Sequence, residues 1–372
     1  MKYSRGLEGV IADQTAISDV EGDIGRLSYR GYAIEELVAL DYEAVMWLVL
    51  FGELPSAGEQ ARLTDWLAVN GVLAPTDIDL LGKLPAGLHP MRMLQGLIPL
   101  LGDNNCPEFP GLSAEGAAGL SIVARLPALI AGFRGLSTRS VMPAYDQEVG
   151  YLQNFLTMFT GATPSAEHLD VFRTVQILQM EHSFNAGTFT GRVVASTLAP
   201  VAAVLSAAVG ALAGPLHGGA DEAALNDAKR VGSPGAAADF VDQLLADKGK
   251  LMGMGHREYR RVDPRAVILK PLAEHLCIGR PQQQVFETLV ALETAFNAAM
   301  AKKGKEVWAN LEFYKGPVYE ALGIPSDYFT ATFAMSRAVG WLAHFVESRA
   351  DNRIIRPKAD YVGAPHRRVA LS

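Results

Sequence analysis

The chain has 372 residues, of which 49% are hydrophobic and 20% are charged, so it can form two domains and is too apolar to be intrinsically disordered. Its 33 basic residues are outnumbered by 40 acidic ones, which excludes a general basic coating of the kind that binds nucleic acid. Two cysteines, Cys106 and Cys277, exclude a disulfide scaffold, and the N-terminus has no apolar segment typical of a secretion signal, so we expect a cytoplasmic protein.

The first predicted elements are short strands. Residues 7–32 alternate β-type runs with turn residues at Glu21-Gly22 and Arg30-Gly31, which predicts a small hairpin or meander. Helical spacing of apolar residues then covers 33–51 and dominates the rest of the chain. Further helices are predicted over 56–72, 89–101, 117–133, 151–160 and 166–186. Because strand signals after residue 32 are scarce, the sequence predicts a mainly α protein with a minor β element at the N-terminus.

Residues 193–213 are apolar on all sides and could be mistaken for a membrane span. The segment contains Pro200 and several small residues, and it leads directly into a polar loop. Because it is the only segment of this kind in the sequence, we expect it to be a helix in the centre of a large core, with no membrane partner.

A domain boundary is expected in the glycine-rich loop that follows this apolar segment. The more charged helices of residues 219–323 would form a small domain. Residues 1–218 and 324–372 would together form the large domain, since a strongly apolar helix resumes near the C-terminus. A cleft between two domains is the expected place for a ligand.

The most informative stretch is LMGMGHREYRRVDPR, residues 251–265. Gly253 and Gly255 precede His256, and four arginines follow within nine residues. A basic surface loop would show the same pattern. A local basic cluster on an acidic protein, however, favours a site for a small polyanion.

The end of the same stretch predicts a helix start. Asp263 is expected to cap the first amides of the helix, and Pro264 fits its first turn. Arg265 would then lie where the helix N-terminus already favours an anion.

Three further segments carry candidate chemistry. His217 precedes a predicted helix, whose N-terminus would keep the imidazole neutral; it is either a hydrogen-bond donor in a site or a turn residue in solvent. His182 and Asn185 are expected on one face of a helix end, as a site or as a satisfied polar pair. Glu312 has apolar and aromatic neighbours, which would raise its pKa and make it a better base; taken alone, the segment favours an exposed glutamate on a half-buried strand or turn.

The C-terminal part adds basic residues. Arg337 is expected to emerge from an apolar helix face, because its helical neighbours include Phe333 and Trp341. Such an arginine needs a carboxylate or phosphate partner, either internal or on a ligand. Arg356 and Lys358 belong to a basic run near the C-terminus. Either one residue of this run serves the same anion across a subunit boundary, or the run is a solvated basic tail.

Motifs for several other chemistries are absent from the sequence. There is no HExxH motif, no His/Cys ligand spacing, no GxSxG motif and no nucleotide-binding glycine loop. We therefore expect neither a metal site nor a bound cofactor.

Taken together, the motifs of this chain resemble those of the citrate synthase family from end to end. The segments that carry the resemblance are LEGVIADQTAISDVEGDIGRLSYRGYAIEEL, EHSFNAGTF, GPLHGGA, MGMGHREYRRVDPRA, EFYKGPVYEALGIP and SRADNRIIRPKADYVG. The resemblance implies an almost wholly helical homodimer whose large and small domains close over oxaloacetate and acetyl-CoA. It also implies a transferase of the tricarboxylic acid cycle that needs no cofactor.

By motif position, the resemblance implies a role for each candidate residue. His217 would polarise the acetyl-CoA carbonyl, Glu312 would act as the base, and His256 would bind and protonate the oxaloacetate carbonyl. The residues implied to bind oxaloacetate are His182, Asn185, Arg265, Arg337 and Arg356 of the partner subunit. The residues implied to bind CoA are Arg260, Gly253, Gly255 and Lys358.

Two positions of the base motif differ from the usual family pattern. Glu312 stands where most members have aspartate, and a displacement of about one ångström can lower a rate on the order of a hundredfold. Lys315 follows in the same motif. The leading hypothesis is citrate formation from acetyl-CoA and oxaloacetate with hydrolysis of citryl-CoA. The alternatives are a 2-methylcitrate synthase that uses propionyl-CoA and a low-activity paralogue that mainly binds oxaloacetate or CoA.

Overall fold

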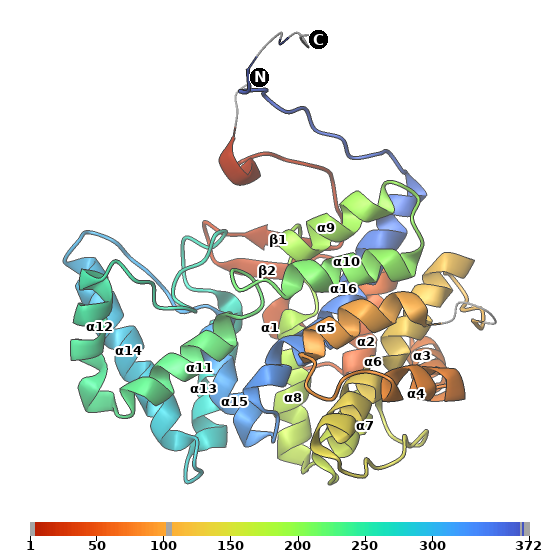
Figure 1. The fold of residues 1–372 in the computed structure, drawn as a ribbon, viewed down its shortest axis with the longest axis horizontal. Coiled ribbons are helices and arrows are strands. Elements are labelled where there is room, and N and C mark those ends of the chain that lie inside the picture. The colour runs from red at the N-terminus through yellow and green to blue at the C-terminus, as the bar shows by residue number, and fades with distance from the viewer. Residues whose placement is uncertain (1–3, 102–105, 365–366, 368–372) are drawn as a thin grey trace, which may run out of the picture.

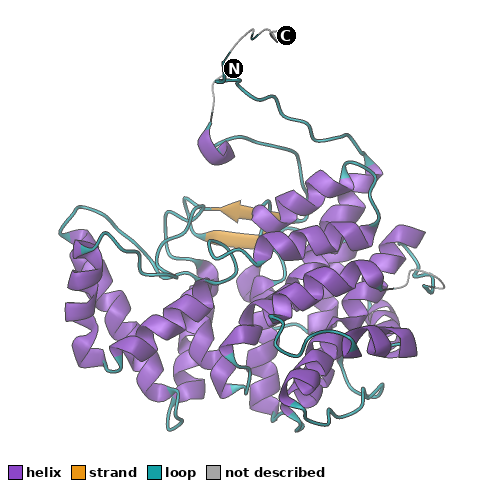
Figure 2. Cartoon of the chain, viewed as in Figure 1, coloured by secondary structure: helices purple, strands orange, loops and turns teal. Residues whose placement is uncertain are grey.

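The computed structural model describes residues 4–101, 106–364 and 367. Its described residues form sixteen α-helices and one small sheet (Figure 1), and helices dominate every part of the body (Figure 2). The helices are α1 (Ile34–Leu37), α2 (Tyr42–Phe51), α3 (Ala57–Asn70), α4 (Pro75–Gly82), α5 (Pro90–Leu97), α6 (Ala114–Thr138), α7 (Tyr151–Thr160), α8 (Ala166–Gln179), α9 (Ala186–Ala195), α10 (Val201–Leu212), α11 (Ala220–Val231), α12 (Ala237–Ala246), α13 (Pro264–Cys277), α14 (Gln283–Ala301), α15 (Leu311–Ala321) and α16 (Phe329–Ala350). The predicted mainly α class is confirmed.

The predicted N-terminal β element is a three-stranded antiparallel sheet. Its strands are β1 (Ser18–Glu21), β2 (Arg26–Tyr29) and β3 (Tyr32–Ala33), in the order β1-β2-β3. The β1–β2 turn lies against the loop that follows His256, where the Arg260 backbone N–H donates to the Gly22 carbonyl at 2.9 Å. A Cβ on Gly22 would lie 2.0 Å from the Glu258 carbonyl oxygen, so this close approach requires glycine.

The prediction of one apolar helix over residues 193–213 is wrong. The segment contains two helices, α9 and α10, and Pro200 is the N-cap of the second. Proline has no N–H to continue a helix and disfavours helical geometry in the residue before it, so the chain breaks here. Among the described residues, the helix long and apolar enough to cross a membrane is instead α6, and 89% of its apolar window is buried inside the protein.

Two other predicted helices also differ from the structure. The stretch over residues 33–51 is divided into α1 and α2, because Asp41 adopts an extended conformation as the N-cap of α2. The helix predicted over 166–186 ends at Gln179. The short helix α4 was not predicted.

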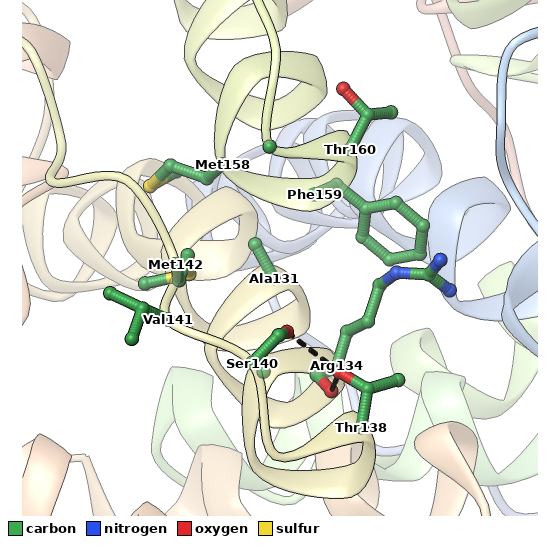
Figure 3. A pocket seen from close by; sticks show the side chains of 11 residues that line it. Ala131, Arg134, Thr138, Ser140, Val141, Met142, Met158, Phe159 and Thr160 are labelled. Atoms are coloured by element: carbon green, nitrogen blue, oxygen red, sulfur yellow. Dashed lines mark hydrogen bonds between the residues drawn. The ribbon is translucent and has the colours of Figure 1, made fainter.

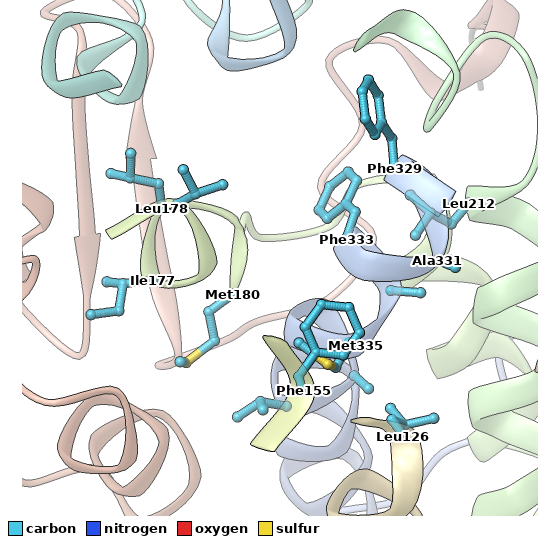
Figure 4. Close-up of a cluster of buried hydrophobic side chains, with 14 of the residues drawn as sticks. Leu126, Phe155, Ile177, Leu178, Met180, Leu212, Phe329, Ala331, Phe333 and Met335 are labelled. Atoms are coloured by element: carbon cyan, nitrogen blue, oxygen red, sulfur yellow. The ribbon is translucent and has the colours of Figure 1, made fainter. Parts of the chain in front are cut away.

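The hydrophobic core is built around α16. Figure 4 shows buried side chains of this helix, such as Phe333 and Met335, with Leu126 of α6 and Phe155 of α7 nearby and Leu178 of α8 in the same cluster. Between its first residue and Phe345 every side chain of α16 is buried, as expected of a helix at the centre of a helical core. Any polar residue on α16 is therefore carried into the interior.

Helices α11 to α15 lie together on one side of the molecule in Figure 1. Within this group α11 packs on α14 and α15, α12 packs on α14, and α13 packs on α15. They fall within residues 219–323, and the division of the chain into a small and a large domain stays a prediction.

Candidate active site

The loop before His256 is fastened to the segment that leads into α15. The backbone N–H of Gly255 donates to the Trp308 carbonyl at 2.7 Å, and the backbone N–H of Asn310 donates to the Gly253 carbonyl at 2.9 Å. The Asn310 side chain adds a third bond from Nδ2 to the Gly255 carbonyl at 3.0 Å. These bonds fix His256 relative to the first turn of α15.

Gly253 and Gly255 are both required by the backbone of this loop. Their φ angles are 79° and 86°, in the left-handed region that favours glycine. A Cβ on Gly253 would also lie 2.9 Å from the ring of Phe313. The two glycines therefore shape the loop, and their implied contact with CoA stays a prediction.

The ring of His256 is held in one tautomer. Its Nδ1 accepts from the backbone N–H groups of Glu258 at 3.0 Å and Tyr259 at 3.3 Å. Burial and the Arg265 guanidinium lower the pKa of His256, against the opposing effect of nearby carboxylates. The imidazole is thus neutral, and because Nδ1 is an acceptor, its proton is on Nε2, where it can be donated to a ligand.

His182 lies beside His256. The ring centroids of the two histidines are 5.2 Å apart, and His182 Nε2 is 3.1 Å from the Tyr259 hydroxyl. Burial, followed by the charge of Arg265, lowers the pKa of His182 well below its usual value. The structure therefore brings together two neutral imidazoles.

The prediction that His182 and Asn185 share a helix face is wrong. Helix α8 already ends at Gln179, and His182 lies in the loop before α9. Asn185 is the N-cap of α9, and its Oδ1 accepts from the backbone N–H groups of Gly187 at 3.0 Å and Thr188 at 3.1 Å. Asparagine is a preferred N-cap residue, and this preference places Asn185 at the start of α9 and not on a helix face with His182. The implied contact of Asn185 with oxaloacetate stays a prediction.

Asp263 caps α13 as predicted and also holds the Arg265 side chain. Its Oδ1 accepts from the backbone N–H and from Nε of Arg265, both at 3.0 Å, and its Oδ2 accepts from Nη2 at 2.8 Å. Burial opposes the charge of Arg265, but Asp263, Tyr259 and Glu312 together raise its pKa. The guanidinium is therefore a rigid, permanently charged group in the interior.

Arg337 emerges from an apolar face of α16, as predicted, and is only 1% exposed. Its Nε donates to the Gln179 carbonyl at 2.6 Å, and its guanidinium lies 4.7 Å from the Phe333 ring centroid. Among the described residues, no carboxylate oxygen lies within 4.0 Å of it. A buried cation without a carboxylate partner fits an anionic ligand.

His217 lies just before α11, where the sequence predicts it. Its Nδ1 is buried and has no hydrogen-bond partner among the described residues. Burial, followed by the charge of Arg337, lowers the pKa of His217 to about 4. The imidazole is neutral at physiological pH and has hydrogen-bonding capacity left for a ligand.

Glu312 is in the first turn of α15, half-buried, and neither on a strand nor fully exposed. Its backbone N–H is capped by Asn310 Oδ1 at 3.1 Å. The expectation of a raised pKa is wrong. Burial does raise the pKa of Glu312, but the charges of Arg265 and Lys315 outweigh it and place the pKa below its ordinary value. The carboxylate is therefore ionised.

The predicted basic ligands lie on the surface. Arg260 is beside the β1–β2 turn, with its side chain 74% exposed and 3.9 Å from Asp23. Arg356 and Lys358 are exposed on the C-terminal segment that leaves the body in Figure 1. Within the described part of this one chain, no hydrogen bond or ion pair links Arg356 or Lys358 to the interior residues.

Two hollows are found away from these side chains. One of about 260 Å³ lies between the ends of α6 and α7, where Arg134 stacks on Phe159 (Figure 3). The other, of about 610 Å³, lies beside β1 and β2. Neither is lined by His217, His256 or Glu312, so the expected cleft between the domains stays a prediction. The described residues contain no group of three His, Cys, Asp or Glu side chains that could hold a metal ion.

Two positions in the site were missed at the sequence level. Tyr259 contacts both histidines, and Asn310 joins the His256 loop to α15. Asn310 had a usable signal, because asparagine before an apolar helical pattern is typical of an N-cap. Tyr259 had none, since its contact with His182 is made between distant parts of the sequence.

Known proteins resemble this chain over almost its whole length. A family model described as citrate synthase, C-terminal domain, matches residues 6–358. The citrate synthase of Mycolicibacterium smegmatis is 38% identical, with 98% of this chain and 96% of the relative covered. The 2-methylcitrate synthase of Shewanella oneidensis is 36% identical, with 98% and 96% covered. A solved citrate synthase of Thermoplasma acidophilum, in a ternary complex with carboxymethyl coenzyme A and oxaloacetate, is 30% identical with a TM-score of 0.92. The match covers 100% of this chain and 98% of that chain. The chain belongs to the citrate synthase family.

Proposed function

We propose that this protein is an acyltransferase that condenses acetyl-CoA with oxaloacetate and hydrolyses citryl-CoA to citrate and CoA. The observation that carries the proposal is the set of charge states in the site. Glu312 is ionised, His217 and His256 are neutral, and two buried guanidinium groups lie nearby. This is the combination that an enol-forming condensation needs.

Glu312 and His217 would perform the first step. A thioester methyl group is a very weak acid, so its deprotonation needs a carboxylate base and a hydrogen-bond donor at the carbonyl oxygen. Glu312 would take the proton, while the neutral imidazole of His217 would donate to the developing enolate oxygen. Because His217 has a pKa of about 4, it donates without being protonated in advance.

Oxaloacetate would be held by the buried cations. It is a dianion, and its two carboxylates would bind Arg265, Arg337 and the His182 ring. The keto oxygen would accept a hydrogen bond from His256 Nε2–H. Two backbone N–H groups donate to Nδ1 of this ring, and they therefore keep its proton on Nε2. As the enol carbon attacks, His256 would protonate this oxygen. The base, acid and oxyanion donors are all side chains, so the reaction would need no cofactor.

CoA would bind at the surface above the site. The exposed guanidinium of Arg260 lies on the same loop as His256, which supports a contact with CoA phosphates. Because Gly253 and Gly255 have no side chains, they would let CoA approach the backbone of the loop. Lys358 would add a positive charge for the CoA phosphates.

A CoA-release assay with oxaloacetate tests the proposed reaction. We expect acetyl-CoA to give a kcat/KM at least about tenfold higher than propionyl-CoA or butyryl-CoA, since one methylene in a fitted pocket changes the ratio by roughly 10- to 200-fold. Mass spectrometry of the product should show citrate. A preference for propionyl-CoA would instead identify a 2-methylcitrate synthase. A silent wild type that Glu312→Asp makes active would identify the low-activity paralogue.

We also propose a homodimer in which the C-terminal segment of each chain completes the other's site. The segment leaves the body in Figure 1 and exposes apolar side chains that a partner would cover. Ile354 is 61%, Tyr361 75% and Val362 90% exposed. The same segment would bring Arg356 of the partner subunit to the oxaloacetate carboxylates.

Mixed dimers test the contribution of Arg356. A dimer with Glu312→Gln in one chain and Arg356→Ala in the other keeps one intact site if Arg356 acts across the interface, and none if it acts within its own chain. We therefore expect purified mixed dimers to show about half the native activity, while each parent homodimer is nearly inactive. Mixed dimers as inactive as both parents would contradict the proposal.

A further inference from the structure

Lys315 is a fully buried lysine in the base motif. Its side chain is 0% exposed, and it lies three residues after Glu312, on the same face of α15. Lysine is almost never buried completely unless it is paired. None of the proposed substrate-binding or proton-transfer steps uses Lys315.

The Lys315 ammonium contacts three different segments. Its Nζ is 3.0 Å from Oδ2 of Asp221, which is also 0% exposed, and 3.3 Å from Oε1 of Gln179. It also lies 4.4 Å from the ring centroid of Phe333. Lys315 therefore joins α15 to the start of α11, to the end of α8 and to α16.

Each of these segments carries a residue of the site. Asp221 follows His217 by four residues, in the first turn of α11. The Gln179 carbonyl accepts from Arg337, and the Phe333 ring contacts the Arg337 guanidinium as well as Lys315. Lys315 is thus the junction at which the histidine, carboxylate and arginine segments meet.

Stability alone does not account for this ion pair. Removing two charges from water costs about as much as their attraction returns, and apolar residues of similar volume are often as stable or more stable. Burial raises the pKa of Asp221, and Lys315 opposes that effect. A methionine–asparagine or leucine–leucine pair would fill the same space without this conflict.

We propose that Lys315 is a positioning residue for the condensation: its contacts with Asp221, Gln179 and Phe333 set the separation of His217 and Glu312 and hold a cation one helical turn from the base. The inference rests on the proposed function of the site. The charge effect has a direct basis, because burial would raise the pKa of Glu312 and the charges of Arg265 and Lys315 lower it. Without Lys315, less of the base would be ionised, and its distance from the acetyl carbonyl would no longer be fixed.

Lys315→Met in the full-length protein tests the proposal, since methionine keeps the length and the contact with Phe333 but not the charge. We expect kcat to fall roughly 10- to 100-fold, the range for a small misplacement of a reacting group. The acidic limb of the kcat profile should move to higher pH, because kcat is lost as pH falls through the pKa of Glu312. The KM for oxaloacetate should stay unchanged, since its cationic ligands are intact.

Lys270→Met is the matched control. Lys270 is on α13, with Nζ 2.6 Å from Oε2 of Glu293 on α14 and 5.1 Å from the ring centroid of Tyr314 on α15. The Lys270→Met variant thus removes a lysine that also has a carboxylate and an aromatic partner but lies outside the site. We expect it to leave kcat and the pH profile unchanged.

A second readout does not depend on turnover. In protein labelled with ¹³C at glutamate carboxyls, the Glu312 signal is the one lost in Glu312→Gln, and we expect it to titrate at higher pH in Lys315→Met. An unchanged titration and an unchanged acidic limb would overturn the proposal even if the variant were less stable. Should the single variant not fold, Lys315→Gln is the second test, because its amide can still donate to Asp221 but carries no charge. The Glu312 titration should again move to higher pH, and no shift would overturn the proposal. A wild type that releases no CoA would reject the proposed function, while this titration would still decide the charge effect of Lys315.

Discussion

Replacing Glu312 with glutamine is expected to lower kcat by about a thousandfold, the middle of the range for loss of a general base. An amide has nearly the same shape but cannot accept the methyl proton of acetyl-CoA. The fold should be retained, because the cap of α15 uses the Glu312 backbone N–H and not its carboxylate. Steady-state CoA release and oxaloacetate binding by calorimetry measure the two effects separately.

Glu320→Gln is the control for this variant. Glu320 is on the same helix but pairs with Lys229 near the surface, at 2.5 Å. We expect its kcat to match the wild type. If Glu312→Gln kept kcat within about tenfold of the wild type, well short of the loss expected for a base, Glu312 would not be the base.

The helical class was predictable because apolar spacing is a local signal. The pattern located α7 to the residue and predicted the hairpin turns at Gly22 and Gly31. The prediction of a single helix over 193–213 was wrong because it relied on the continuous apolar character of the segment. Pro200 is the stronger local signal, since proline interrupts a helix. The core helix α6 (Ala114–Thr138) extends beyond the predicted residues 117–133 at both ends, although the prediction correctly continued through Pro127.

The candidate site was predictable where one sequence motif contains both the functional residue and the residue that contacts it. Asp263 and Arg265 are only two residues apart in the sequence, and the predicted cap is present. The prediction that His182 and Asn185 share a helix face failed because an asparagine at an N-cap and one on a helix face look alike in sequence. The predicted direction of the Glu312 pKa shift was wrong because the pKa depends on Arg265 and on other charges that only the fold brings near.

Replacing His256 with alanine is expected to lower kcat/KM by about a hundredfold to a thousandfold, the loss typical of one donor to a developing oxyanion. The imidazole supplies the Nε2–H that would bind and protonate the oxaloacetate carbonyl. The loop should keep its course, because its bonds to Trp308 and Asn310 are made by backbone atoms of Gly253 and Gly255. His275→Ala, which removes an exposed histidine 3.2 Å from Glu167, is the control and should leave kcat/KM unchanged.

Proton exchange at the methyl group of acetyl-CoA separates the two halves of the reaction. Exchange with deuterated water needs the base and the donor to the thioester, but no protonation of the keto oxygen. With a non-reactive oxaloacetate analogue bound, His256→Ala should therefore keep exchange while it loses condensation, whereas Glu312→Gln should lose both. If His256→Ala retained most condensation activity, the donor to the keto oxygen would have to be another residue. Loss of exchange in a folded His256→Ala variant would place His256 in the enolisation step instead, beside His217.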